Sequence, residues 1–460
     1  MPTVASFDDS YQAGLEVESS SIQQADTDSH EESAVSHLDF AGLDSPTLSK
    51  LLVGLQCALL VLFFVGTTYD DDSYSHAQYS VFRDIMVMLL LGFGFLMTFL
   101  RKYGLGSVGL TLMITALAVQ LNIFTELFLR FTYNGAVNFP YTLSVSSLID
   151  AEFSAAALLI SFGAVIGRVS PVQMVIMTVS QSFFYALNKV IVVLGWWDAE
   201  DVGGTITIHM FGAYFGVAIS YALGPPKASS VQNANPNRVS DILTMIGTTL
   251  LWVYWPSFVG ATETGNTRNE SRCILHTVLG LLGSTVAAFF MSQYRSKGKF
   301  NPVHIANSTL AGGVAVGASA RLNMTPGGAL LLGTLAGLIS VHGYVESSPR
   351  LERKISTYDT CGVNNLHGYP SLLGGLASIL FVAIDSNAAF LPQGVSVVWL
   401  CFSQFMAVVC CVVVAVLSGF VTGKLMAFVK AKGEADDYDD ALWWIGSYFV
   451  DEESPGKVSL

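Results

Sequence analysis

Two short segments far apart in the chain carry the same spacing of an aspartate, a glycine and a histidine. One runs from Asp201 to His209 and the other from Asp359 to His367, and both read D-x-x-G-x-x-x-x-H. An imidazole donates or accepts hydrogen bonds and changes its charge near neutral pH. Both histidines fall in apolar surroundings, where ionisable side chains are costly and mark functional positions by default. The repeated pattern therefore predicts a buried polar path lined by His209 and His367.

The aspartate that opens each segment is open to two interpretations. An aspartate at the start of a helix commonly caps free backbone N–H groups. An aspartate beside a buried path can instead attract a cation, so the sequence leaves both roles open for Asp201 and Asp359. His276, His304 and His342 lack a matching segment, and we interpret each of them as structural.

The elements that hold these residues are expected to be membrane-spanning helices. The chain is 52% hydrophobic and only 12% charged, whereas about a quarter of the residues in a soluble domain are charged. A spanning helix needs about 20 apolar residues. The segments that qualify are 50–68, 82–100, 106–129, 144–167, 171–196, 202–223, 239–261, 273–293, 302–320, 326–345, 363–387 and 395–428. The fold class predicted is an all-α polytopic membrane protein with about twelve transmembrane helices.

The positions of the two histidines suggest an internal repeat. They fall in the sixth and eleventh spans, so spans two to six and seven to eleven form two five-helix units. Because five is odd, the second unit is inverted across the membrane, and inverted repeats place substrate sites near the bilayer midplane. An extra N-terminal span and a long last helix complete this arrangement. Glycines four residues apart, at 313/317 and 333/337, predict closely packed helices.

The tails differ from the centre of the chain in charge. Of the 35 acidic residues, ten precede Lys50 and eight follow Lys432. We therefore divide the chain into a disordered acidic N-tail (1–47), a transmembrane domain (48–430) and an acidic C-tail (431–460), with the first span as signal anchor. The distribution of Lys and Arg between the loops places both tails in the cytoplasm, and we expect a plasma-membrane protein. Asn269 and Asn323 then become candidate glycosylation sites outside the cell.

Several classes of function find no support in the sequence. The cysteines show no C-x-x-C spacing, and neither H-E-x-x-H nor G-x-S-x-G occurs. We expect no enzyme activity, no cofactor, no metal and no nucleic-acid partner.

Six long stretches of the chain resemble the Rh-glycoprotein branch of the Amt/Mep/Rh ammonium transporter family. They are DVGGTITIHMFGAYFG (201–216), NSTLAGGVAVG (307–317), DTCGVNNLHGYPSLLGG (359–375), WVYWPSF (252–258), FGAVIGRVSPVQ (162–173) and FRDIMVMLLLGFGFLMTFLRKYG (82–104). The resemblance covers about 50–430. It implies a homotrimer in a lipid bilayer, with one narrow pore in each subunit. It also implies that His209 and His367 share a hydrogen bond in the pore, that Phe153 and Phe258 close its outer mouth, and that Asp201 and Asp359 are the matched acidic residues.

Three residues near the expected vestibule depart from the family pattern. Lys189 stands where Rh proteins often carry Glu, Asn364 where they often carry His, and Glu152 where Asp is usual. A base in place of an acid is expected to weaken the recruitment of cations on that side.

The function that we expect is ammonium transport. An apolar path favours NH3 over NH4+, since a bare cation is expensive to desolvate. The hypothesis is that NH4+ is recruited, loses a proton and passes as NH3. Whether the proton follows along the histidines, and whether CO2 also passes, stay open. The alternative is a non-conducting structural or sensing membrane protein of the same fold.

Overall fold

The computed structural model describes residues 45–69, 75–135, 139–385, 394–429, 437–441 and 443–444. The predicted disorder of the N-tail lies outside these residues, as does most of the C-tail.

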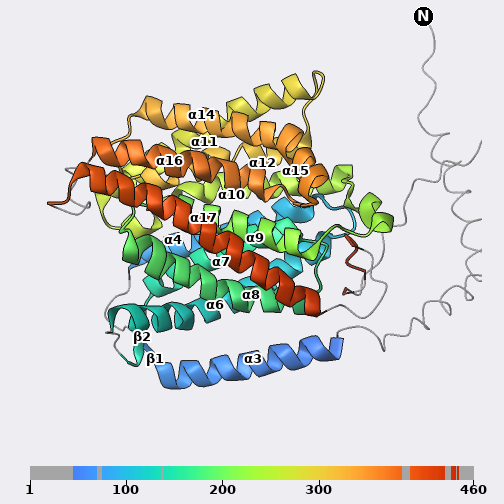
Figure 1. The fold of residues 1–460 in the computed structure, drawn as a ribbon, viewed down its shortest axis with the longest axis horizontal. Coiled ribbons are helices and arrows are strands. Elements are labelled where there is room, and N and C mark those ends of the chain that lie inside the picture. Colours follow the sequence, from blue (N-terminus) through green and yellow to red (C-terminus); the bar gives the residue numbers. More distant parts are fainter. Residues whose placement is uncertain are drawn as a thin grey trace, which may run out of the picture. The chain divides into compact units, whose positions relative to one another are not determined.

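Long apolar helices make up the described part of the chain (Figure 1). Eleven helical segments in it are long and apolar enough to cross a membrane. Five are single α-helices: α3 (Ser45–Gly66), α6 (Gly104–Asn134), α7 (Val145–Val165), α11 (Thr267–Arg295) and α17 (Val397–Phe428). The other six are composite and span His76–Phe99, Pro171–Trp196, Thr205–Leu223, Arg238–Glu263, Pro326–Ile355 and Asn364–Ile384. These eleven agree with eleven of the segments expected from hydropathy.

The composite helices contain turns that are wider or tighter than an α-helix. Their pieces, in chain order, are α4 (His76–Val87), η4 (Met88–Phe93), α5 (Gly94–Leu96), η5 (Met97–Phe99), α8 (Pro171–Ala186), η6 (Leu187–Trp196), η7 (Thr205–Met210), α9 (Phe211–Leu223), α10 (Arg238–Gly260), η9 (Ala261–Glu263), α14 (Pro326–His342), η11 (Gly343–Ser347), α15 (Ser348–Ile355), η12 (Asn364–Gly368) and α16 (Tyr369–Ile384). Of these, η4, η6, η7, η11 and η12 are π-helical. A short η8 (Ala228–Ala234) lies between α9 and α10.

The remaining expected segment, 302–320, is a broken helix. It consists of α12 (Pro302–Ser308), α13 (Ala311–Val316) and η10 (Gly317–Ser319). The backbone N–H groups of Leu310 and Gly313 donate to carbonyls three residues back, which tightens the chain around the break between α12 and α13. Residues 304–320 are buried, and irregular backbone at membrane depth is tolerated where protein surrounds it. Hydropathy recognises the burial of this segment but not its interruptions.

Two short strands depart from an all-helical chain. β1 (Thr67–Tyr69) follows α3, and β2 (Tyr141–Leu143) precedes α7. They pair in parallel, with Thr67 opposite Tyr141. The pairing joins the end of the first span to the start of the fourth (Figure 1).

An arginine joins three separate elements at one end of the helices. Arg321 follows η10, and its Nε and Nη2 donate to the two carboxylate oxygens of Glu200, at 2.9 and 2.6 Å. Its Nη1 donates to Glu263 Oε1 of η9. Gln404 of α17 accepts from the Glu200 N–H and donates to its carbonyl. The side chain of Glu200 is only 2% exposed, so its charge depends on Arg321.

Replacing Arg321 with alanine is therefore expected to destabilise the protein strongly. Breaking a buried ion pair by removing one partner costs about 3–5 kcal/mol, because the other charge stays buried. The thermal unfolding midpoint of purified protein should fall by several degrees. Arg350→Ala is the matched control, since Arg350 is exposed and its partner Glu346 also pairs with Arg295, and it should change little. Equal midpoints for the two variants would contradict the role given to Arg321.

Candidate functional site

The two D-x-x-G segments adopt the same local structure. Gly204 has a φ of 68° and Gly362 a φ of 71°, in the left-handed region that favours glycine. The Asp201 carboxylate accepts from the backbone N–H groups of Ile206 and Thr207, at 2.9 and 2.7 Å. The Asp359 carboxylate also accepts from two backbone N–H groups, those of Val363 and Asn364, which lie one residue closer in the chain, at 2.9 and 2.8 Å. Both aspartates therefore cap a helix start, which is the first of the two interpretations left open by the sequence.

Each capped helix begins with a π-helical turn, and each turn carries one histidine. His209 lies in η7, where its N–H donates to the Gly204 carbonyl five residues back. His367 lies in η12. π-Helical turns are rare and frequently occur at functional sites. The sequence pattern gave no signal for these wider turns.

The structure brings the two imidazoles together. His367 Nδ1 lies 3.2 Å from His209 Nδ1, within hydrogen-bond distance. The rings are stacked, with centroids 5.1 Å apart and planes inclined by 10°. His209 is 1% exposed and His367 2%. The Nε2 atom of His209 is buried and has no hydrogen-bond partner among the described residues.

Aromatic rings continue the histidine pair on both sides. On one side, the ring of Phe258 lies next to His209, with the two ring centroids 5.9 Å apart. The ring of Phe153 then packs edge-on against Phe258, with a centroid distance of 5.2 Å. Beyond His367 lies Phe93 of η4, stacked at 6.3 Å. The result is a continuous row of rings drawn from five elements, α7, α10, η7, η12 and η4. We call the Phe153–Phe258 end of this row the phenylalanine mouth.

Trp255 is a site residue that sequence reasoning missed. It lies one turn before Phe258 on α10, is fully buried, and stacks on His209 with centroids 5.4 Å apart and planes inclined by 20°. Gly313 makes room for its indole, because a Cβ at that glycine would lie 2.6 Å from Trp255 Nε1. Phe93 was missed in the same way. Both residues lie in stretches whose resemblance to the family had been noted, but no spacing marked them individually.

The electrostatics of the aspartates differ from those of exposed carboxyls. Burial raises the pKa of Asp201 to about 7 and that of Asp359 to about 6, although the hydrogen bonds from backbone N–H groups oppose these shifts.

The three vestibule candidates occupy different environments. Glu152 is fully buried on α7, and neither of its carboxylate oxygens has a hydrogen-bond partner in the described chain. Asn364 is buried, and its N–H helps to cap η12 through Asp359. Lys189 is buried on η6 and forms ion pairs with Glu126 and Asp150. None of the hydrogen bonds of these three side chains is to His209 or His367.

The two candidate glycosylation sites also differ. Asn269 is 8% exposed, and its Nδ2 donates to Glu263 at 2.9 Å. Asn323 is exposed, and its Oδ1 accepts from Arg272. Only Asn323 presents a side chain that a modifying enzyme could reach in the folded protein. Glycosylation at Asn323 stays a prediction.

Two of the three histidines interpreted as structural form polar contacts with residues elsewhere in the chain. His276 Nδ1 lies 2.7 Å from the Ala320 carbonyl, and His304 Nδ1 lies 3.3 Å from Ser292 Oγ. His342 is exposed. These contacts agree with their interpretation as structural residues.

The fold and the site together define a multi-pass membrane protein of the transporter or channel class. Comparison with known proteins gives the family. Residues 47–443 match the model of the Ammonium Transporter Family. The chain is 37% identical to Ammonium transporter Rh type A of Bos taurus, an alignment that covers 86% of this chain and 94% of the relative. It is also 37% identical to Ammonium transporter Rh type B of Xenopus tropicalis, covering 85% and 91%. The chain therefore belongs to the ammonium transporter family.

Solved structures agree with this assignment. Rh50 of Nitrosomonas europaea, described as one of the Rhesus protein family of channels, superposes with a TM-score of 0.71 at 35% identity and covers 82% of this chain and 94% of its own. Mep2 of Candida albicans shares the fold, with a TM-score of 0.61, at 17% identity, covering 76% of this chain and 84% of its own. The Rh branch expected from the sequence is thus confirmed.

Proposed function

We propose that this protein conducts ammonia across a membrane along the row of rings that contains His209 and His367. The observation that carries the proposal is the stacked, hydrogen-bonded imidazole pair in buried, aromatic surroundings. Membership of the ammonium transporter family supplies the substrate class. In this proposal NH4+ is recruited at the phenylalanine mouth, loses a proton and passes the imidazoles as NH3.

The physical argument rests on solvation. A cation loses its hydration when it enters an apolar passage, and such a loss is expensive unless fixed charges replace the water. The imidazole rings and their aromatic neighbours bring no fixed negative charge to the row. Neutral ammonia has far less hydration to lose, and it can exchange hydrogen bonds with ring nitrogens on the way. A passage of this composition therefore selects the neutral form.

The distribution of Lys and Arg between the loops suggests how the chain is oriented in the membrane. We propose that both tails lie in the cytoplasm of a plasma-membrane protein, so that the phenylalanine mouth faces outward.

The exposed apolar side chains of α3, including Val61 and Phe64, suit contact with lipid or with a second copy of the chain. We propose a homotrimer, on the precedent of the family resemblance, and an inverted relation between the two histidine-bearing units.

Two measurements on the same liposomes test the proposal. Purified protein is reconstituted and exposed to an ammonium jump, first in a stopped-flow assay of internal pH and then on a solid-supported membrane that records current. The expected result is faster internal alkalinisation than in protein-free liposomes, without a sustained current. A sustained current would show that charge crosses and would overturn passage as NH3. Alkalinisation at the protein-free rate would favour the non-conducting alternative. A CO2 jump on the same liposomes tests passage of that gas.

A further inference from the structure

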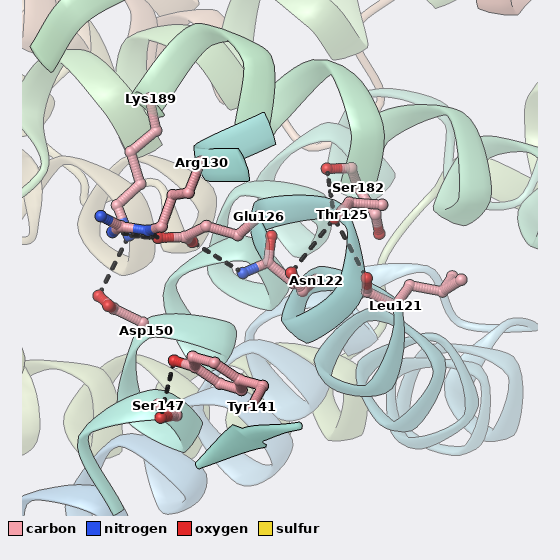
Figure 2. A network of polar contacts seen from close by, with 10 residues as sticks. All are labelled: Leu121, Asn122, Thr125, Glu126, Arg130, Tyr141, Ser147, Asp150, Ser182 and Lys189. Atoms are coloured by element: carbon pink, nitrogen blue, oxygen red, sulfur yellow. Dashed lines mark hydrogen bonds and ion pairs between the residues drawn. The ribbon is translucent and has the colours of Figure 1, made fainter. Parts of the chain in front are cut away.

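Four charged side chains from three helices meet in one cluster (Figure 2). Glu126 and Arg130 lie on α6, Asp150 on α7 and Lys189 on η6. Lys189 Nζ lies 3.3 and 3.2 Å from the two oxygens of Glu126 and 3.1 Å from Asp150 Oδ1. Three carboxylate oxygens thus surround one ammonium group.

The position of Asp150 connects this cluster to the proposed path. Asp150 precedes Phe153 by three residues on α7, so the two side chains lie on the same helix face, about one turn apart. Its side chain is 41% exposed, whereas those of Glu126 and Lys189 are 8% and 10% exposed. Asp150 is therefore the exposed carboxylate of the cluster, one helical turn before the mouth residue Phe153.

A small cavity next to the cluster offers further oxygen atoms. Its volume is about 70 Å³, and its polar lining comes from Asn122, Glu126, Arg130, Tyr141, Ser147 and Asp150. Asn122 is 1% exposed, and its Oδ1 is buried without a hydrogen-bond partner in the described chain. The hydroxyls of Tyr141 and Ser147 lie 3.1 Å from each other. An ammonium ion carries one more N–H than a lysine amine, and this lining supplies acceptors for it.

We propose that Lys189 is a tethered ammonium ion that fills a two-carboxylate cation site and thereby weakens the attraction of the phenylalanine mouth for free ammonium. The amine of lysine is a compact charge with three N–H donors, close in chemistry to NH4+. With Lys189 in place, two acids face two bases and the cluster is neutral. Without it, the cluster carries one net negative charge, on the half-exposed Asp150. The consequence for transport rests on the proposed function, but the site itself does not.

The cluster is built so that Lys189 can be removed without leaving Glu126 unpaired. Arg130 Nε donates to Glu126 Oε1 at 3.0 Å, and Arg130 Nη2 donates to the same oxygen. Asn122 Nδ2 donates to the other oxygen at 3.3 Å. Asp150, in contrast, has Lys189 as its ion-pair partner and can be solvated when that partner is lost. Lys189→Met, which keeps the length of the side chain, is therefore a suitable probe.

The test compares Lys189→Met with Lys189→Arg and with the double variant Lys189→Met/Asp150→Asn. In liposomes, Lys189→Met should reach half-maximal flux at an ammonium concentration about ten-fold lower than the wild type does. A shift of this size is expected when an ammonium ion meets one more net negative charge a few ångströms away at an intermediate dielectric. The gain should shrink at high salt, since an exposed charge is screened. Lys189→Arg and the double variant should behave like the wild type. An unchanged half-maximal concentration in Lys189→Met, or a gain that persists in the double variant, would overturn the proposal.

A second readout separates this inference from the transport proposal. A ligand that binds the folded state raises the unfolding midpoint. Ammonium chloride, compared with choline chloride at the same ionic strength, should therefore stabilise detergent-purified Lys189→Met more than the wild type. This measurement decides the site even if no variant conducts. If Lys189→Met fails to assemble, Lys189→Gln serves in its place. If ammonium raises the unfolding midpoint equally in the variant and in the wild type, the proposed cation site is wrong.

Discussion

Alanine in place of His209 should reduce the ammonia flux of reconstituted protein by about ten-fold or more. The substitution leaves Nδ1 of His367 without its partner at a buried position. An unsatisfied buried polar group costs about 1–3 kcal/mol, and about 1.4 kcal/mol in a barrier is a factor of ten in rate. It also opens the row of rings between Phe258 and His367, which water can enter. Stopped-flow alkalinisation of liposomes measures the effect.

The His209→Ala experiment needs a histidine outside the pair as its control. His342→Ala removes an exposed imidazole on α14 and should leave the flux unchanged. His367→Ala should resemble His209→Ala, because each ring is the other's partner. Size-exclusion chromatography establishes that the variants assemble as the wild type does. Wild-type flux in a correctly assembled His209→Ala protein would remove the pair from the path.

Leucine in place of Gly333 should prevent stable folding. Gly333 lies on α14 where this helix crosses α11, and a Cβ there would lie 2.1 Å from the Gly280 carbonyl oxygen and 2.6 Å from its Cα. These are backbone atoms, so the helices themselves would have to separate. Overpacking of a core costs about 1–3 kcal/mol and occasionally more, and a rigid backbone contact belongs at or above the upper end. The yield of monodisperse protein and its unfolding midpoint should both fall sharply.

Another glycine of the same helix provides the control. Gly327 is the second residue of α14, and a Cβ there would meet nothing within 4 Å. Gly327→Leu should therefore assemble as well as the wild type. A Gly333→Leu protein as stable as Gly327→Leu would show that the two helices can move apart without cost.

Hydropathy and repetition accounted for most of the fold and for the centre of the site. Lipid imposes long apolar runs, so eleven helices could be located from hydropathy alone, and the repeated spacing of Asp201 and Asp359 predicted the histidine pair. The close approach at Gly333 also followed from its spacing with Gly337. Each of these signals is local in the chain, or repeats within it.

What escaped prediction depends on contacts between distant segments. Nothing near Lys189 in the sequence shows that Glu126 and Asp150 surround its amine, so its effect was judged from the residue type alone. Trp255 stacks on His209 from a helix distant in the sequence, and residue spacing does not encode such a contact. The break in 302–320 follows from close packing on every side, whereas hydropathy measures only that the segment is apolar. The π-helical turns at both histidines are likewise set by how each helix start is anchored.

The contact between the two Nδ1 atoms makes the two ends of the histidine pair different, although the two segments that carry the histidines match. A neutral imidazole carries one hydrogen, on either Nδ1 or Nε2. Two neutral rings that share a hydrogen bond through Nδ1 must therefore be opposite tautomers. The donor ring has a bare Nε2 that accepts, and the acceptor ring has a protonated Nε2 that donates. Along the proposed path, ammonia thus meets unlike edges at the two ends of the pair. Their order reverses when a proton moves between the two Nδ1 atoms while the former acceptor ring releases its Nε2 proton and the former donor ring takes one up at Nε2.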